Sequence, residues 1–120
     1  MHVLLLDSTA EQARIAQILN RRGHEVVSEG SGSRAIELLE DPKNHFDGVV
    51  MEVVLRDLDG LSVLAHLVES LGESAPPTVV VSDFSQMSVV EQALGLGIRD
   101  FVVKPFSDER LEAALSRMGC

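Results

Sequence analysis

The 120-residue sequence has no tryptophan and no tyrosine, and its aromatic share of 3% consists of four phenylalanines. A packed core must therefore come mainly from Leu, Val, Ile and Ala; apolar residues make up 45% of the chain, which is usual for a folded domain. The only cysteine is Cys120, so an internal disulfide is excluded. A chain of this length fits one domain and can bury a core without a metal or a disulfide.

Basic residues are also few. Ten Lys and Arg residues stand against nineteen Asp and Glu residues, which gives a formal net charge of -9. Nucleic acid and anionic membranes repel such a surface, so we expect this segment to bind neither directly. No apolar run approaches the ~18 residues of a membrane helix, and the N-terminal residues lack the features of a signal peptide. These absences predict a soluble, cytoplasmic protein.

Short apolar runs alternate with segments of helical periodicity five times. The runs expected to be strands are Val3–Leu6, Glu25–Ser28, Gly48–Val53, Thr78–Ser82 and Asp100–Lys104. We expect a helix after each run, with Ser8 and Glu11 forming a capping box for the first helix and Ser33 capping the second. Because the runs are unbroken rather than alternating, both faces of the sheet should be covered. The pattern predicts one doubly wound α/β domain over residues 1–120 with a parallel sheet.

Polar side chains stand where four of these strands end. They are Asp7, Glu52, Ser82 and Lys104. The carboxyl ends of parallel strands meet at one edge, where doubly wound folds place their sites. Two carboxylates, a hydroxyl and an ammonium there can bind a divalent cation, bind an oxyanion or pair with one another.

Common nucleotide and hydrolase motifs are missing. The first strand is followed by no glycine-rich turn, and the sequence has no GxxxxGK[ST] loop and no Gly-x-Ser-x-Gly elbow. The four histidines are scattered, without a metal-ligand spacing, and are expected to be ordinary surface or strand-edge residues. These absences argue against a flavin or nucleotide domain, a third reading of the α/β pattern.

Four segments in order resemble the receiver domains of two-component response regulators, over essentially the whole chain. They are Val3 to Ser8, Glu52 with Asp59-Gly60 seven residues later, Val80-Val81-Ser82, and Phe101-Val102-Val103-Lys104-Pro105-Phe106. The resemblance implies a flavodoxin-like fold with five helices and a five-stranded parallel sheet in the order 2-1-3-4-5. It also implies a cis Lys104-Pro105 bond.

In that family, two adjacent acidic residues and an acceptor Asp hold Mg2+, and a Lys and a Thr or Ser bind the transferred phosphoryl group. By position, the resemblance assigns Asp7 to the second acid, Glu52 to the acceptor, Ser82 to the hydroxyl switch, Phe101 to the rotating aromatic and Lys104 to the lysine. No residue is therefore assigned a catalytic role, and no cofactor other than Mg2+ is implied.

Three positions depart from the family pattern. Leu6 stands at the first acidic position, Glu52 at the acceptor and Arg56 at a loop proline. An alignment shifted by one residue instead pairs Asp7 with the first acid and Ser8 with the second, so one acid is missing either way. The unshifted alignment, which keeps the spacing to Gly23 without a gap, is preferred, and it places the apolar Leu6 side chain beside the site.

The altered residues predict a weak or absent Mg2+ site at Asp7 and Glu52, because Mg2+ demands near-ideal oxygen geometry. The extra methylene of Glu52 displaces its oxygens by more than an ångström (about one C–C bond), which impairs in-line transfer. The longer carboxylate can instead reach Lys104 or Ser82 and mimic part of the charge of a phosphorylated state. A decayed pocket in a simple scaffold is the competing interpretation.

The leading functional hypothesis is a non-enzymatic, phosphorylation-independent receiver that binds a partner protein or its own output domain. The alternative is a competent Mg2+-dependent receiver phosphorylated by a histidine kinase. The resemblance places the signalling surface, including self-association, on the fourth helix, fifth strand and fifth helix. On the fourth helix, Val90, Ala93 and Leu94 are expected to be buried, and Met87, Val89 and Leu96 to face outward. A complete protein and a fragment of a longer regulator both fit the length.

Overall fold

The computed structural model describes residues 1–119, and Cys120 lies outside the described residues. In chain order the elements are β1 (His2–Leu6), α1 (Gln12–Arg21), β2 (Glu25–Glu29), α2 (Gly32–Glu40), β3 (Gly48–Met51), α3 (Gly60–Leu71), the short 3-10 helix η1 (Gly72–Ser74), β4 (Thr78–Ser82), α4 (Met87–Gly95), β5 (Asp100–Val103) and α5 (Asp108–Ser116). The strands form one sheet in the order β2-β1-β3-β4-β5, and every neighbouring pair is parallel. The predicted fold class and strand order are confirmed.

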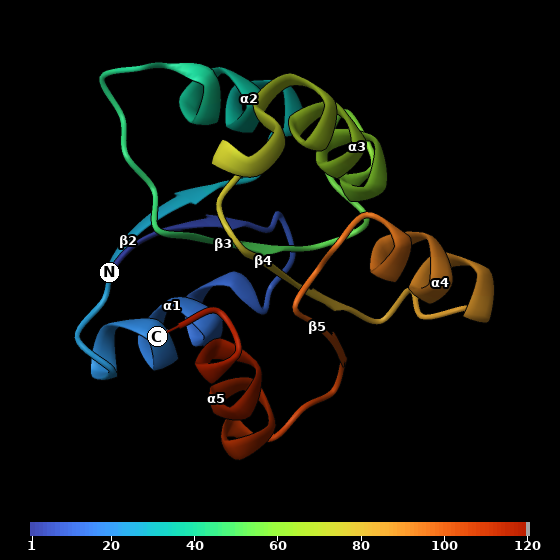
Figure 1. The fold of residues 1–120 in the computed structure, drawn as a ribbon. Helices are drawn as coiled ribbons and strands as arrows, with labels where there is room; N and C mark the ends of the chain where they lie inside the picture. Colours follow the sequence, from blue (N-terminus) through green and yellow to red (C-terminus); the bar gives the residue numbers. More distant parts are fainter. Residues whose placement is uncertain (120) are drawn as a thin grey trace.

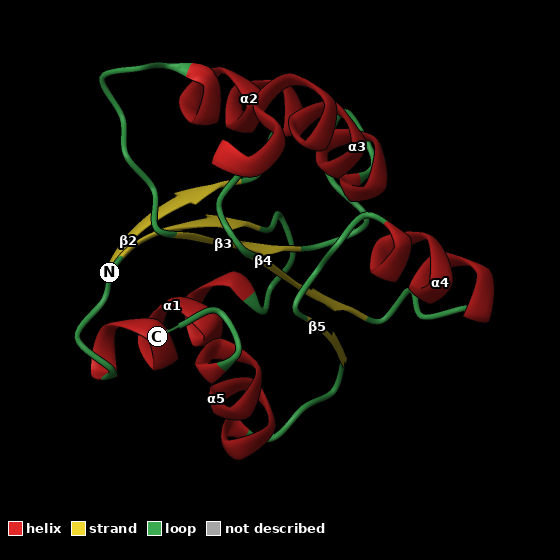
Figure 2. Cartoon of the chain, in the orientation of Figure 1, coloured by secondary structure: helices red, strands yellow, loops and turns green. Residues whose placement is uncertain are grey.

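Helices cover both faces of the sheet (Figure 1, Figure 2). The side chains of α2, α3 and α4 pack on one face, and those of α1 and α5 pack on the other. The side chains of β1 alternate between the two faces of the sheet. Leu4 and Leu6 belong to the core on the side of α2, α3 and α4, while Val3 and Leu5 belong to the core on the side of α1 and α5. Among residues 1–119, no helix is long and apolar enough to cross a membrane.

Two predicted helix caps are wrong. Helix α1 begins at Gln12, and Ser8 does not cap it, because the turn before the helix is stabilised by other side chains. Asp7 Oδ1 accepts the N–H of Thr9 at 2.6 Å, and Thr9 Oγ1 accepts the N–H of Glu11 at 3.2 Å. These hydrogen bonds between side chains and the backbone form two successive turns after β1, and they take the place of a capping box.

Helix α2 is capped by Ser31 instead of Ser33. The Ser31 hydroxyl accepts the N–H of Arg34 at 3.2 Å, which is the geometry of a helix N-cap. Ser33 lies inside the first turn, where its own N–H donates to the carboxylate of Asp57 at 3.2 Å. The helix therefore starts earlier than the sequence pattern indicated.

Asp57, in the loop between β3 and α3, binds the start of α2 from outside that helix. Its Oδ1 accepts the N–H of Gly32 at 2.7 Å, and its Oδ2 accepts the hydroxyl of Ser31 at 2.9 Å. Hydrogen bonds from Ser33, Gly32 and Ser31 lower the pKa of this carboxyl, with the side chain of Ser33 as the largest contribution. Asp57 thus ties the loop after Glu52 to α2 and is more than a solvated loop charge.

Replacing Asp57 with Ala is expected to lower the melting temperature by about 4 °C, because the first turn of α2 loses an acceptor for its N–H groups. A carboxyl whose folded pKa is depressed contributes stability above its unfolded pKa of about 3.9, and loses it as the pH falls through the folded value. The difference in melting temperature between wild type and variant should therefore shrink on acidification below about pH 4. Circular dichroism melts at neutral and acidic pH check this, and a constant difference across that range would contradict it.

The buried face of α4 differs from the predicted one. Val89 and Ala93 are buried and Val90 is half-buried, whereas Leu94 is 54% exposed. Val89 and Ala93 are four residues apart, so they define the face that meets the core. Met87, 74% exposed, is on the outer side as expected, so α4 carries apolar side chains toward solvent.

Candidate functional site

The register of the sheet brings two carboxylates together. Leu6 of β1 pairs with Met51 of β3, so the next residues along each strand, Asp7 and Glu52, lie side by side at the carboxyl edge. The N–H of Glu52 donates to the carbonyl of Leu6 at 2.8 Å, which continues the strand pairing by one step. Both carboxylate side chains are only 1% exposed.

The ammonium of Lys104 lies between these carboxylates. Its Nζ is 3.1 Å from Asp7 Oδ2, 3.0 Å from Glu52 Oε1 and 2.9 Å from Thr9 Oγ1. A lysine ammonium has three donors, so the side chains of this chain satisfy all of them. The predicted pairing of Glu52 with Lys104 is therefore observed, and residues of the chain itself occupy every donor of the lysine.

Thr9 was missed as a site residue in the sequence. A hydroxyl two residues after Asp7 is a weak signal by itself, because Ser and Thr are common in turns for backbone reasons. Only the folded chain shows that the loop after β1 turns this hydroxyl toward Lys104.

Burial and ion pairing act on Lys104 in opposite directions. Burial alone would lower the pKa of this lysine, but the hydrogen bond and charge of Glu52, followed by those of Asp7, outweigh it and raise the pKa above its ordinary value. The lysine side chain is 9% exposed. A buried group of this kind is held in its charged state by the carboxylates around it.

The remaining carboxylate oxygens bind backbone N–H groups. Glu52 Oε2 accepts the N–H of Val53 at 2.5 Å and that of Val54 at 3.3 Å, while Asp7 Oδ1 accepts that of Thr9 at 2.6 Å. All four oxygens of the carboxylate pair are thus bound to donors of the protein. Within the described part of the chain, no group of three or more His, Cys, Asp or Glu residues is arranged to hold a metal. In this arrangement the two carboxylates serve as acceptors for Lys104 and for backbone N–H groups of the chain.

The Leu6 side chain does not lie beside this cluster. It is fully buried in the core on the side of α2, α3 and α4, together with Leu4 and Met51. Side chains alternate across a strand, so the neighbouring Asp7 points to the opposite side. The expectation that Leu6 adds apolar carbons to the site is therefore wrong.

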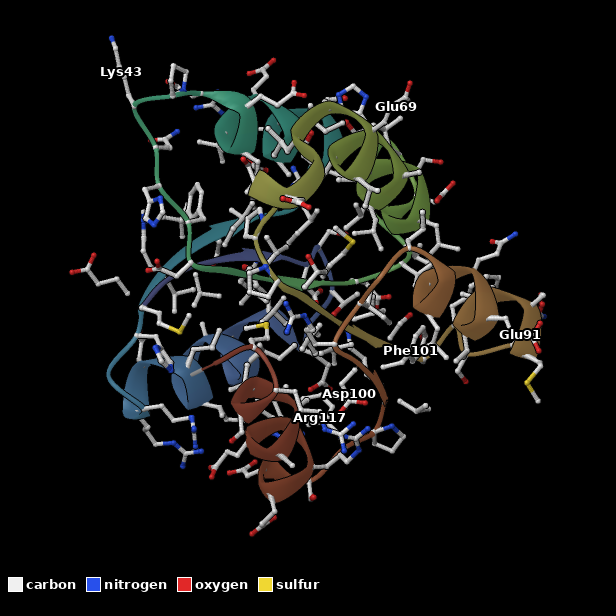
Figure 3. All side chains as sticks on the ribbon, viewed as in Figure 1. Lys43, Glu69, Glu91, Asp100, Phe101 and Arg117 are labelled. Carbon is white, nitrogen blue, oxygen red and sulfur yellow. The ribbon has the colours of Figure 1, made fainter. Side chains whose placement is uncertain are left out.

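Ser82 and Phe101 lie near the edge but outside the ion-pair cluster. The Ser82 hydroxyl is buried and accepts the N–H of Phe84 at 3.0 Å, and no hydrogen bond joins it to Glu52 or Lys104. Phe101 on β5 is 8% exposed and belongs to the core cluster that includes α4 (Figure 3). The Lys104–Pro105 peptide bond is cis, as the resemblance implied.

An open cavity of about 420 Å3 leads to Lys104 and Glu52. Two further carboxylates, Glu11 and Asp83, also line it, and the rest of the lining comes from Thr9, Ala10 and Pro105. An anionic phosphoryl donor in this cavity therefore faces the carboxylates of Glu11, Glu52 and Asp83 beside a lysine whose donors are already in use.

Comparison with known proteins agrees with this architecture. The family described as the response regulator receiver domain matches residues 3–116. The chain is 36% identical to the transcriptional regulatory protein PdtaR of Mycobacterium tuberculosis over 86% of this chain and 50% of that protein. It is 29% identical to the chemotaxis protein CheY of Bacillus subtilis over 96% of this chain and 94% of that protein.

The solved structures show the same fold. A CheY-like receiver domain protein of Methanospirillum hungatei superposes with a TM-score of 0.85 at 20% identity, covering 98% of this chain and 93% of that one. The receiver domain of a sensor histidine kinase of Pseudomonas aeruginosa, which holds a magnesium ion in its active-site cleft, gives a TM-score of 0.83 at 22% identity and covers 99% of this chain and 98% of that one.

Many relatives are longer. The chain spans half of PdtaR and 14% of a response regulator-like protein, APRR7, of Arabidopsis thaliana, to which it is 31% identical over 82% of its own length. The shared part is the receiver unit of two-component signalling, a regulatory module. On the match over residues 3–116, together with the strand order, this chain belongs to the response regulator receiver domain family.

Proposed function

We propose that this receiver domain signals through protein contacts without aspartyl phosphorylation, and that Glu52 takes part of the role of a phosphorylated acceptor. The observation that carries the proposal is the contact of Glu52 Oε1 with Lys104 Nζ at 3.0 Å inside a buried cluster. In the family, the lysine binds the oxygens of the transferred phosphoryl group. Here a side-chain oxygen of the chain itself already holds that lysine.

The charge of the site supports this reading. A carboxylate at Glu52 supplies one negative charge, whereas a phosphoryl group supplies up to two. Asp7 adds a second carboxylate oxygen to the same ammonium at 3.1 Å. Together the two carboxylates supply to Lys104 the charge that a phosphoryl group would bring.

The placement of Leu6 in the core favours the alignment in which Asp7 takes the first acidic position and Ser8 the second. Ser8 is exposed and follows directly on the buried Asp7. A hydroxyl at the second position removes a carboxylate from any metal site there, and Mg2+ prefers charged oxygen ligands. The missing acid is thus assigned to Ser8 rather than to Leu6.

A titration with Mg2+ and beryllofluoride, followed by amide NMR shifts, tests the proposal. The wild-type domain is expected to show no saturable shifts at Glu52, Ser82, Phe101 and Lys104 up to millimolar Mg2+. The matched variant is Ser8→Asp combined with Glu52→Asp, which places an aspartate at each altered position and is expected to respond. Saturable shifts in the wild type would instead establish the competent Mg2+-dependent receiver.

We assign the partner contact to the face of α4, β5 and α5. Three apolar side chains are open to solvent there: Met87 is 74% exposed, Leu94 is 54% exposed and Val103 is 48% exposed. Met87 and Leu94 are seven residues apart and share one side of α4. Large apolar groups gathered on one face are typical of contact surfaces, and the partner is an output domain, another protein or a second copy of the chain.

A further inference from the structure

A groove between α3 and α4, separate from the carboxylate cluster, has the size and lining of a small-molecule site. Its volume is about 610 Å3, within the range of about 300–1,000 Å3 that ligand pockets occupy. The walls come from the first half of α3, from α4 and from the loop that carries Phe84, and Val53 forms part of the lining. Figure 1 shows α3 above the sheet and α4 at the right of the view.

The lining is mainly apolar, with few polar groups. Leu61, Phe84 and Leu96 supply apolar surface, and Phe84 is 43% exposed despite its size. Asp59, Ser62 and Gln92 supply the polar atoms, and no Lys or Arg lines the groove. A carboxylate without a cation nearby is complementary to a ligand that brings its own positive charge.

The carboxylate of Asp59 is held in a fixed orientation. Its Oδ1 accepts the N–H of Ser62 at 2.8 Å, and its Oδ2 accepts the hydroxyl of the same residue at 3.0 Å. Each oxygen keeps a further lone pair for a donor. The exposed ring of Phe84 adds a surface that attracts organic cations. We propose that this groove binds a small apolar molecule that carries an ammonium group, with the apolar body against Leu61 and Leu96 and the cation at Asp59.

The groove and the carboxylate cluster share one segment of backbone. Val53 lines the groove, its N–H donates to Glu52 Oε2 at 2.5 Å, and its carbonyl accepts the N–H of Gly60 at 2.6 Å. A ligand that contacts Val53 therefore acts on the residue that orients Glu52. Binding in the groove is an input to the cluster that requires no phosphoryl transfer, and it holds whether or not the domain can also be phosphorylated.

The test is an amide NMR titration with three probes that share one apolar body: phenylbutylammonium, phenylbutanol and phenylbutanoate. The ammonium is expected to bind with a dissociation constant of about 1 mM or weaker, with saturable shifts confined to the groove lining and to Glu52 and Lys104. It should bind about fivefold tighter than the alcohol, and the carboxylate should not bind.

Asp59→Asn keeps a good helix cap and removes the charge, and it is expected to reduce the affinity of the ammonium to that of the alcohol. Glu91→Gln removes the same charge from the exposed part of α4 outside the groove (Figure 3) and should leave the affinity unchanged. If both variants lowered the affinity for the ammonium equally, the probe would be attracted nonspecifically to an acidic protein, and the proposed site would be wrong.

Four other results would overturn the proposal or a part of it. Equal affinity for all three probes, or no saturable shift, would contradict the proposal that the groove binds an ammonium compound. Shifts of the lining residues that depend on protein concentration alone would assign the groove to a second copy of the chain. Binding that leaves Glu52 and Lys104 unmoved would overturn the coupling through Val53.

Discussion

Replacing Lys104 with Met is expected to lower the free energy of unfolding at pH 7 by about 3–5 kcal/mol, the usual cost of removing one partner of a buried ion pair. The lysine is the only cation in contact with Asp7 and Glu52 among the described residues, and both carboxylates are 1% exposed. Without it, two like charges remain side by side in a buried site. The hydrogen bonds that backbone N–H groups donate to these carboxylates offset only part of that repulsion.

Urea unfolding of the Lys104→Met variant, followed by circular dichroism, measures this loss. The matched control is the double variant Lys104→Met with Glu52→Gln, which removes a charge of each sign. It should be clearly more stable than the single variant, because replacing both members of a buried pair costs less than breaking it. A single variant as stable as the wild type would show that the cluster is open to water in solution.

Replacing Gly60 with Ala is expected to destabilise the domain by about 3 kcal/mol, because the added methyl group has no space. A Cβ on Gly60 would lie 2.3 Å from the backbone oxygen of Glu52 and 3.1 Å from the Cα of Val53. Both are backbone atoms, so no side chain can rotate away. The start of α3 would have to move away from the segment after β3 that carries Glu52, and the hydrogen bond from Gly60 N–H to Val53 would lengthen.

The matched control is Gly95→Ala at the end of α4. A Cβ there meets no atom within 4 Å, so Ala should stabilise the helix by up to about 1 kcal/mol. Thermal unfolding of both variants therefore gives changes of opposite sign. The Gly60→Ala variant should also show altered amide shifts at Val53 and Val54. A neutral effect at Gly60 would mean that the close approach to Glu52 is not maintained in solution.

The fold could be predicted from the sequence because its strands are unbroken apolar runs separated by helical periodicity. β4 has the predicted bounds, Thr78–Ser82, and α5 buries one apolar face through Leu111, Ala114 and Leu115. The helix caps were predicted less reliably, because several residues near the start of a helix can act as its cap. Ser8 and Ser33 both fit a capping pattern, yet Asp7, Thr9 and Ser31 provide the observed bonds.

The strand-end residues of the site and the pairing of Glu52 with Lys104 could be predicted, whereas the part of Thr9 and the orientation of Leu6 could not. The strand ends place Asp7, Glu52 and Lys104 at one edge, and the structure joins them. The orientation of Leu6 depends on which residue begins the alternation of β1 between the two faces, and one shift reverses it. No local pattern indicates the contacts of Asp57, because its partners lie more than twenty residues away in sequence.

Glu52 divides its two oxygens between different partners, one for Lys104 and one for the N–H groups of Val53 and Val54. An aspartate at this position is one methylene shorter and reaches about 1.5 Å less far. It would therefore lose part of these contacts. Under the proposed function, a mutation from Glu to Asp thus loses stabilising contacts before it restores an acceptor, and Ser8 must still become acidic. Under the proposed function, substitutions at both Glu52 and Ser8 separate this receiver from the acceptor site of its family, and the one at Glu52 costs hydrogen bonds that the present fold uses.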